Sequence, residues 1–166
     1  MLFVLTLLAG GNLALAQADS PHASNAVFLE LLGNGGVVSL NYERLVNDRL
    51  ALRVGYGTWK DNALFGPSNE QQASSMPVSA SYLFGPGERK LEIGGGITFG
   101  HRESLDGTKS SFRSLTAIVG YRTQPAGRGY LFRAGVTPFY SLDSGSAAYP
   151  NPGFSFSAGV SFGYRF

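Results

Sequence analysis

The chain has no cysteine and carries little charge. Asp, Glu, Lys and Arg make up 14% of its 166 residues, against roughly 25% in an ordinary soluble domain. Without cysteine the chain has no disulfide, no thiolate nucleophile and no cysteine-ligated zinc. The formal net charge of +2 includes no basic block, so we expect no nucleic-acid partner. A soluble domain of this size needs more charge on its surface, and the composition therefore argues against an ordinary cytosolic enzyme.

Glycine and aromatic residues are abundant instead. Glycine occupies 23 positions and aromatic residues make up 13% of the chain. This aromatic content, together with the small net charge, excludes intrinsic disorder. The run Gly94-Gly95-Gly96 has no following Lys-Ser/Thr pair, so we interpret it as close strand packing rather than a phosphate loop. Two histidines are too few for a structural zinc site, and we expect no metal and no cofactor.

The longest strongly apolar stretch begins at the first residue. Residues 1–11 are too few for a membrane-spanning helix, which needs about 20 residues, but they suit the apolar region of a secretory signal. Ala14-Leu15-Ala16 supplies the small-x-small pattern that a signal peptidase cuts, although no Lys or Arg precedes the apolar run. We expect a signal peptide over 1–16, a mature leader over 17–25 and one domain over 26–166. The alternative is a buried amino-terminal helix.

From Ala26 onward the apolar residues recur with a period of two, which is typical of half-buried strands. The last segment is the clearest example, because every second residue from Phe154 to Phe166 is apolar, while the residues between them are Ser, Gly or Arg. Seven further segments alternate in the same way, beginning near Val27, Val38, Leu50, Met76, Leu91, Leu115 and Tyr130. The pattern predicts eight strands and no helix after the signal.

The connections between these segments alternate in length. The second, fourth and sixth are short turns, whereas the third, fifth and seventh are longer and polar, over roughly 60–75, 102–111 and 141–152. Short turns at one rim and long loops at the other are typical of an outer-membrane barrel. The first connection is only Asn34-Gly35, a dipeptide that favours a type I′ hairpin turn.

Turn lengths also predict the strand register. A two-residue turn at Asn34-Gly35 sets Leu31 opposite Val38 on the apolar face. A three-residue loop at 47–49 in the second hairpin sets Glu43 opposite Arg53 on the polar face. We therefore expect these two side chains to face each other and to form an ion pair.

The polar face of the strands is mostly Gly, Ser, Thr and Ala, which suits a narrow barrel interior better than a water-facing exterior. The large side chains then face lipid; the alternative is a soluble barrel with an aromatic core. The isolated charges form an expected lumen charge network of Glu30, Glu43, Arg53, Glu92, Arg122, Arg133 and Arg165, either a structural plug or a gated ion path. Two expected aromatic belts lie at the short-turn rim (Tyr42, Tyr82, Phe84, Tyr121, Tyr130, Phe132, Tyr164, Phe166) and at the long-loop rim (Tyr56, Phe99, Tyr140, Phe154).

With its eight alternating segments, its loop asymmetry and its ending GVSFGYRF (159–166), the chain resembles small outer-membrane β-barrels of the OmpA/OmpX type. The resemblance implies an all-β, eight-stranded, antiparallel up-and-down transmembrane barrel in the bacterial outer membrane, with its long loops outside. It also implies that Phe162, Tyr164 and Phe166 are part of a carboxy-terminal signal for the barrel-assembly machinery. The family implies membership and not an activity.

Three further groups of residues are candidates for chemistry. His22-Ala23-Ser24-Asn25 resembles the His-x-Ser-Asn stretch of lipid A deacylases, but it precedes the first strand, whereas in that family the stretch lies late in the barrel. We interpret His101-Arg102-Glu103-Ser104 as a solvated polar turn rather than an acid–base site. Lys109 and Arg113 fall on the lipid-facing side near the outer rim, where they either bind lipopolysaccharide phosphates or extend to the interface.

These observations favour a monomeric, non-enzymatic surface barrel with a structural or interaction role. Its expected partners are outer-membrane lipid, lipopolysaccharide and the barrel-assembly machinery, while no residue pattern identifies an external partner. Two alternatives stay open: an enzyme that modifies outer-leaflet lipids, and a narrow pore.

Overall fold

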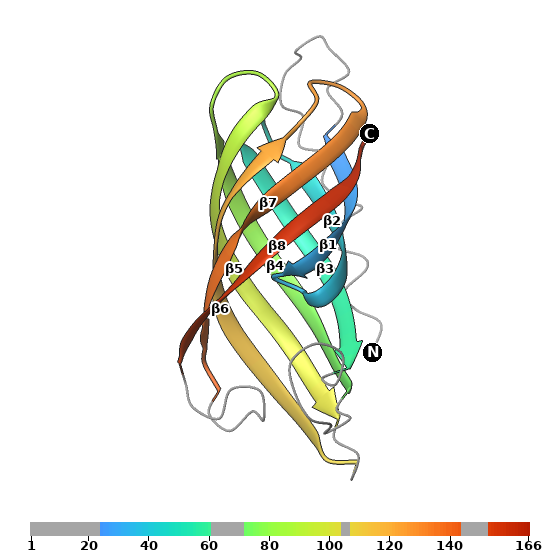
Figure 1. Cartoon of the computed structure of the whole chain (residues 1–166), viewed down its shortest axis with the longest axis vertical. Helices are drawn as coiled ribbons and strands as arrows, with labels where there is room; N and C mark the ends of the chain where they lie inside the picture. Colours follow the sequence, from blue (N-terminus) through green and yellow to red (C-terminus); the bar gives the residue numbers. More distant parts are fainter. Residues whose placement is uncertain (1–23, 61–71, 104–106, 144–152) are drawn as a thin grey trace.

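The computed structural model describes residues 24–60, 72–103, 107–143 and 153–166. Over these residues the chain forms a closed antiparallel barrel in which each strand pairs with its neighbours in the sequence and β8 pairs with β1 (Figure 1). The predicted all-β, eight-stranded, up-and-down fold is confirmed. The strands are β1 (Asn25–Gly33), β2 (Gly36–Leu45), β3 (Leu50–Lys60), β4 (Gln72–Phe84), β5 (Arg89–Glu103), β6 (Lys109–Thr123), β7 (Gly129–Ser141) and β8 (Phe154–Arg165).

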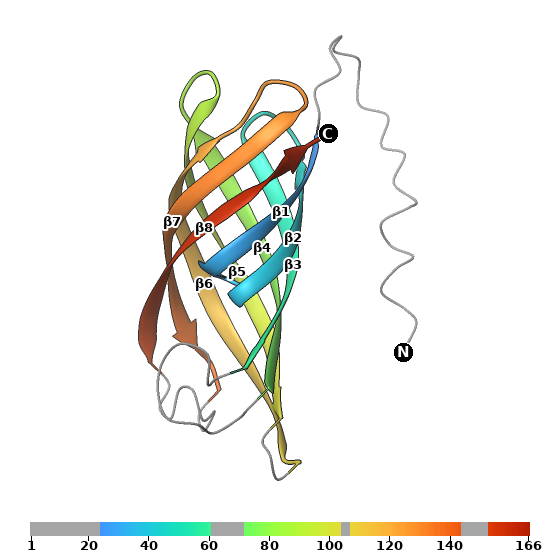
Figure 2. The ribbon, with the colours of Figure 1, turned by 45° about the vertical axis from the view of Figure 1, so that its right-hand side comes forward.

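The described part of the chain contains no helix with the length and apolarity to cross a membrane. The expected signal peptide and most of the expected leader fall on residues 1–23, outside the described residues, and stay predictions. The carboxy terminus lies at the barrel end that carries the short turns, the upper end in both Figure 1 and Figure 2.

The period of two explains which face of each strand points into the barrel. In β1, Val27 and Leu29 are exposed on the outside, whereas Phe28 and Glu30 are buried inside. The other strands repeat this arrangement, so large apolar side chains cover the outer surface and most of the buried side chains are polar or charged. This is the reverse of a soluble protein, as the alternation predicted.

Both predicted hairpin registers are confirmed. Leu31 lies opposite Val38 in the first hairpin, and Glu43 lies opposite Arg53 in the second. The prediction of a type I′ turn at Asn34-Gly35 is wrong. That turn needs positive φ at both residues, and neither residue has it. Positive φ occurs instead at the flanking positions, Leu32 (58°) and Gly36 (95°), where the end of the hairpin bends into the barrel.

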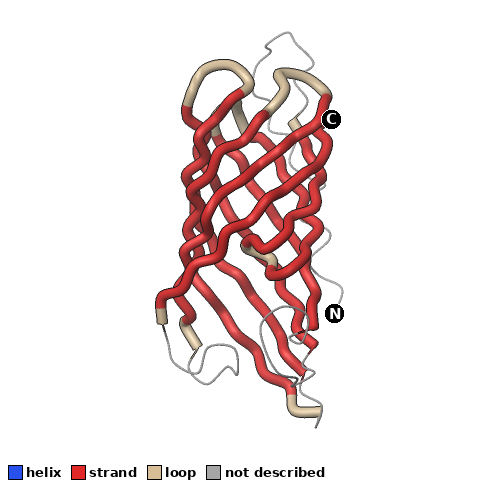
Figure 3. The backbone as a smooth tube through the Cα atoms, viewed as in Figure 1, coloured by secondary structure: helices blue, strands red, loops and turns tan. Residues whose placement is uncertain are grey.

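The fifth connection is shorter than predicted. Residues 101–103 continue β5, and β6 already begins at Lys109, so the predicted polar turn at His101-Arg102-Glu103 is strand. Backbone pairing continues as far as Glu103 opposite Lys109, whose side chains form an ion pair with 3.5 Å between Lys109 Nζ and Glu103 Oε2. The hairpin of β5 and β6 therefore extends the wall well beyond the hairpin of β1 and β2 (Figure 3).

Glycine on the inner face makes room for the large side chains inside the barrel. A Cβ added to Gly163 would lie 2.3 Å from the Cβ of Phe28, its neighbour across the β1–β8 seam. The same glycine lies opposite Leu131 on β7, which is also buried. Because Gly163 has no side chain, the side chains of Phe28 and Leu131 have room to fill this part of the lumen.

Candidate functional site in the lumen

The lumen charge network is assembled from side chains of seven strands. Its members alternate with outward-facing residues, so that the period of two directs each of them inward. All seven side chains are buried, with Arg122 fully so. An isolated ion in such a place costs several kcal/mol, and pairing has to offset that cost.

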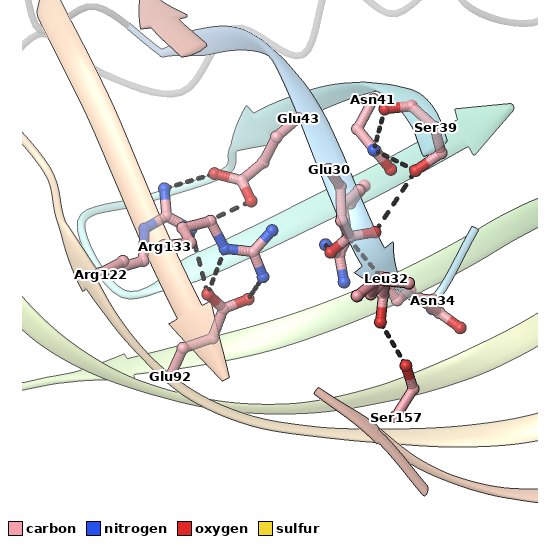
Figure 4. Close-up of polar contacts among 12 residues, drawn as sticks. Glu30, Leu32, Asn34, Ser39, Asn41, Glu43, Glu92, Arg122, Arg133 and Ser157 are labelled. Atoms are coloured by element: carbon pink, nitrogen blue, oxygen red, sulfur yellow. Dashed lines mark hydrogen bonds and ion pairs between the residues drawn. The ribbon is translucent and has the colours of Figure 1, made fainter. Parts of the chain in front are cut away.

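The shortest ion pair of the network joins opposite walls of the barrel. The Arg122 guanidinium on β6 donates two hydrogen bonds to the Glu43 carboxylate on β2, at 2.5 Å from Nη2 to Oε1 and 3.0 Å from Nη1 to Oε2 (Figure 4). This two-pronged geometry is the one that arginine and carboxylate favour. Because β2 and β6 are four strands apart in an eight-stranded ring, the pair crosses the lumen rather than following the wall.

Glu92 on β5 connects two arginines that would otherwise repel each other. Arg122 and Arg133 lie directly opposite in the β6–β7 ladder, a pairing that destabilises a sheet when the charges are alike. Glu92 accepts two hydrogen bonds from Arg133, 2.6 and 2.9 Å long, and lies 3.6 Å from Arg122 Nη1. One carboxylate therefore contacts both guanidinium groups.

The predicted ion pair between Glu43 and Arg53 is wrong, although both side chains point inward in the predicted register. Arg53 instead pairs with Glu30 on β1, at 3.2 Å between Nη1 and Oε1, and donates from Nε to the Ser79 hydroxyl on β4. Glu43 reaches across the lumen to Arg122. The interior is narrow enough for long side chains to find partners beyond the adjacent strand.

The seventh member of the network lies at its edge. Arg165 on β8 donates to the backbone carbonyl of Pro125, in the short turn between β6 and β7. Its contact is therefore with the short-turn rim of the barrel. The carboxylates of the network contact Arg53, Arg122 and Arg133.

Two aromatic rings inside the barrel were not predicted to belong to the site, although the alternation puts Phe28 on the inner face with Glu30. Phe28 is 1% exposed, and the guanidinium carbons of Arg53 and Arg133 lie 5.9 and 5.1 Å from its ring centroid. These distances allow cation–π attraction to both arginines. Nearer the long loops, buried Arg102 lies 5.6 Å from the ring centroid of Phe112. Continuing the alternation past Thr98 would have assigned Arg102 to the inner face.

A small cavity lies beside the network. Its volume of about 20 Å³ has room for one water molecule. Glu30, Arg53, Glu92 and Arg133 line it, together with Gly33 of β1 and residues of β6, β7 and β8. Arg133 Nη1 is buried and has no hydrogen-bond partner among the described residues, so it is a donor available to such a water.

The predicted aromatic belts and the residues of the predicted assembly signal all lie on the outer surface. The exposed fraction of these side chains ranges from 39% for Tyr42 and Phe99 to 71% for Tyr130. In β7 and β8, Tyr130 stacks on Phe162 and meets Tyr164 edge-on, which forms a continuous aromatic patch near the short-turn rim. Phe166 exchanges two backbone hydrogen bonds with Asn25 and so ends the seam between β8 and β1.

Lys109 and Arg113 are on the outside near the long-loop rim, and each contacts a carboxylate. Lys109 pairs with Glu103, and Arg113 donates to Asp143 with 2.9 Å between Nη2 and Oδ1. The hydrogen bond from Arg113 holds the pKa of the Asp143 carboxyl below its ordinary value. A phosphate bound at either cation would compete with these carboxylates.

The remaining candidates for chemistry offer little. His101 Nδ1 lies 3.0 Å from the Ser111 hydroxyl, but the two residues face each other within a single hairpin. His22 and Ala23 fall outside the described residues. Across the four described ranges, no three His, Cys, Asp or Glu side chains are grouped closely enough to hold a metal ion.

Comparison with known proteins identifies the fold. No protein-family model matches the chain, and a search of curated proteins finds no relative. Solved structures do match. The amino-terminal β-barrel domain of OprF from Pseudomonas aeruginosa is similar with 14% identity and a TM-score of 0.63, over 86% of this chain and 96% of that one. The Neisserial surface protein NspA is similar with 19% identity and a TM-score of 0.56, over 86% and 92% of the two chains. The chain therefore has the eight-stranded barrel fold of the OmpA/OmpX type, which it shares with these two proteins.

Proposed function

We propose that the protein is a non-enzymatic, integral outer-membrane barrel with a structural or surface-interaction role. One observation carries the proposal: charged side chains are buried in the lumen while apolar side chains cover the outer surface of all eight strands. Only a lipid environment stabilises that arrangement, since in water it would leave a band of exposed leucine, valine and aromatic residues.

The proposal includes the orientation of the barrel in the membrane, its lipid contacts, its assembly and its oligomeric state. The short turns face the periplasm and the longer connections face the outside. At the outer rim, Lys109 and Arg113 bind lipopolysaccharide phosphates, which replace Glu103 and Asp143 as their ion-pair partners. The exposed aromatic face of β8 engages the barrel-assembly machinery during insertion. The closed ring leaves no seam that requires a second subunit, and we propose a monomer.

Fractionation and gel mobility test the location. We expect the protein in the detergent-extracted outer-membrane fraction, and we expect its folded form to migrate differently from the boiled form on a denaturing gel. Recovery as a soluble periplasmic protein without detergent would contradict the proposal. Mass spectrometry of outer-membrane lipids from cells with and without the protein tests the non-enzymatic assignment, because a modified lipid would indicate an enzyme.

A narrow pore is the second candidate, and the cavity beside Arg53 and Arg133 is the observation that favours it. The pair of Glu43 and Arg122 crosses the lumen beside Glu92, which lines that cavity, so we expect very low conductance in planar bilayers. Replacing Glu43 with alanine removes one side of that crossing. Channel openings that appear only in this variant would indicate a plugged pore, whereas steady openings of the unaltered protein would favour pore function.

A further inference from the structure

The end of the first hairpin does not continue the barrel wall. β1 and β2 are 9 and 10 residues long, whereas β5 and β6 have 15 each, and in Figure 3 the turn between β1 and β2 ends part-way along the barrel. The ladder between β1 and β8 ends at Leu31 opposite Val160, and the ladder between β2 and β3 ends at Ser39 opposite Gly57. Residues 32–36, the hairpin tip, leave the wall at this point.

The hairpin tip bends into the lumen and is held there by hydroxyl groups of other strands, including Ser157 on β8, which donates to the Leu32 carbonyl. Asn34 is 7% exposed, and its side-chain oxygen accepts a 2.8 Å hydrogen bond from Thr98 on β5. The carbonyl of Gly35 accepts another 2.8 Å hydrogen bond from Ser75 on β4. Thr98 and Ser75 are both buried residues of the inner face. A polar turn therefore crosses the interior from the first hairpin to the opposite strands.

The backbone is distorted where the tip leaves each strand. Leu32 has a φ of 58° and is the one residue other than glycine with positive φ in the described ranges, while Gly36 has a φ of 95°. Positive φ is unfavourable for leucine because its Cβ approaches the backbone. Continuing the two observed registers by one pair would instead set Leu32 opposite Gly159 on β8 and Val38 opposite Thr58 on β3.

Because Gly57 on β3 has no side chain, the tip has room to bend into the lumen. A Cβ added to Gly57 would lie 2.0 Å from the carbonyl oxygen of Gly35, which is backbone and cannot rotate away. Gly57 itself does not have positive φ, so alanine fits the local geometry of β3. The added Cβ would also lie 2.9 Å from the carbonyl oxygen of Val38 on β2, which a small shift of the strands relieves, so an alanine there conflicts chiefly with the inward tip.

We propose that the hairpin tip is a movable plug with two positions. In the lumen position it is held by Thr98, Ser75 and Ser157, the last of which donates to the Leu32 carbonyl. There it borders the cavity beside the charge network, and Gly33 is one of the residues that line this cavity. In the wall position it extends β1 along β8 and β2 along β3, which relaxes Leu32 and opens the cavity toward the long-loop end. Three side-chain hydrogen bonds, from Thr98, Ser75 and Ser157, favour the first position, and main-chain pairing with two strands favours the second.

The absence of cysteine in the chain gives a clean test. Thr137 lines the cavity and is 7% exposed, so Thr137→Cys places a single thiol beneath the tip. The reporter protein is refolded in detergent and treated with a charged, water-soluble methanethiosulfonate reagent, and the labelling rate is followed by mass spectrometry. Because the assay is run in micelles, its result is independent of where the protein resides in the cell.

Two substitutions that should change the labelling rate in opposite directions test the proposal. Gly57→Ala excludes the tip from the lumen and should raise the labelling rate about tenfold, the change expected from loss of one to two hydrogen bonds. Leu32→Gly relieves the positive φ of the lumen position and should lower the rate below that of the unaltered reporter. A merely structural turn would make Leu32→Gly neutral.

Two glycine controls separate movement of the tip from other effects. Gly127→Ala adds a methyl group with nothing within 4 Å and should leave the rate unchanged. Gly163→Ala creates a clash near the short-turn rim and reports general loosening of the barrel. Equal rates in Gly57→Ala and Gly163→Ala, or no slowing in Leu32→Gly, would overturn the proposal. If Gly57→Ala does not refold, the pair Thr98→Val and Ser75→Ala removes the hydrogen bonds to Asn34 and Gly35, leaves the one from Ser157, and should still raise the labelling rate.

Discussion

Glu92 contacts two guanidinium groups that directly oppose each other across the ladder of β6 and β7. At the scale of single residues, its carboxylate offsets the repulsion between these two like charges, which would otherwise destabilise the sheet. The other two carboxylates contact one arginine each, Glu43 with Arg122 and Glu30 with Arg53, so Glu43 and Glu92 share Arg122. The interior thus depends on each charge having a specific partner, and removing one member leaves another uncompensated.

A double-mutant cycle tests this dependence. Glu92→Gln leaves Arg133 without its carboxylate and should lower the free energy of unfolding by about 3–5 kcal/mol. Arg133→Met leaves Glu92 with Arg122 alone and should cost a similar amount, while the double change should cost clearly less than the sum. Urea unfolding of refolded protein in micelles, followed by tryptophan fluorescence, gives the values. Additive losses would contradict the pairing, and Lys109→Gln at an exposed ion pair serves as a near-neutral control.

The exposed pair of Arg113 and Asp143 makes a pH-dependent prediction. The hydrogen bond from Arg113 lowers the pKa of Asp143 in the folded protein, so the contact stabilises the fold above the unfolded pKa, about 3.9 for aspartate. That stabilisation is lost as the pH falls through the lowered folded pKa. In an NMR titration of the carboxyl carbon, we expect the Asp143 midpoint to be below the ordinary aspartate value and to rise in Arg113→Gln. An unchanged midpoint in Arg113→Gln would show that the pKa is not set by this contact.

At the scale of strands and hairpins, period and turn length were enough to predict the observed register. Leu31 opposite Val38 and Glu43 opposite Arg53 follow from local sequence alone, because a slip of one residue would reverse both faces. The partner of Glu43 could not be predicted in this way. It is Arg122, 79 positions away, and its approach depends on the tilt and stagger with which eight strands close. The inward bend at Asn34 depends likewise on strands far away in the sequence.

Packing between strands makes a prediction about glycine. Gly163→Ala places a methyl group 2.2 Å from the carbonyl oxygen of Val27 and 2.3 Å from Phe28 Cβ, so the seam has to shift. We expect a loss of about 1–3 kcal/mol in unfolding free energy, the usual cost of overpacking. Gly127→Ala, with open space around the new methyl group, should change stability by less than about 0.5 kcal/mol. A comparable loss in both variants would mean that backbone freedom, and not packing, sets the cost.

At the scale of the whole molecule, the barrel has one seam that is not local. Every other pair of adjacent strands belongs to one hairpin, whereas β1 and β8 come from opposite ends of the domain. Both views of the ribbon show β8 between β7 and β1 (Figure 1 and Figure 2). The last residue completes this seam, since the backbone N–H of Phe166 donates to Asn25 and its carbonyl accepts in return.

The terminal residue should therefore matter for insertion. Phe166→Asp places a carboxylate on the outer face beside Tyr164, where charge is unfavourable even near the rim. We expect a smaller fraction of heat-modifiable protein after refolding into lipid vesicles, whereas Phe166→Tyr should insert like the unaltered chain. Deleting Phe166 should be worse than Phe166→Leu, because the deletion also removes two backbone hydrogen bonds. Equal yields from all four variants would show that neither the aromatic ring nor the seam contact is needed.

The contact between Asn25 and Phe166 also has a kinetic consequence. The ring closes only when β8 pairs with β1, so an intermediate in which β8 has not docked lacks a complete wall. Closing this contact brings together the two ends of the domain, and such long-range closure slows folding. A circular permutant that joins these two ends and begins within the short turn between β4 and β5 would convert the slow seam into a local hairpin. Its refolding rate, compared with that of the natural order, would measure how much of the folding time the closure of the ring takes.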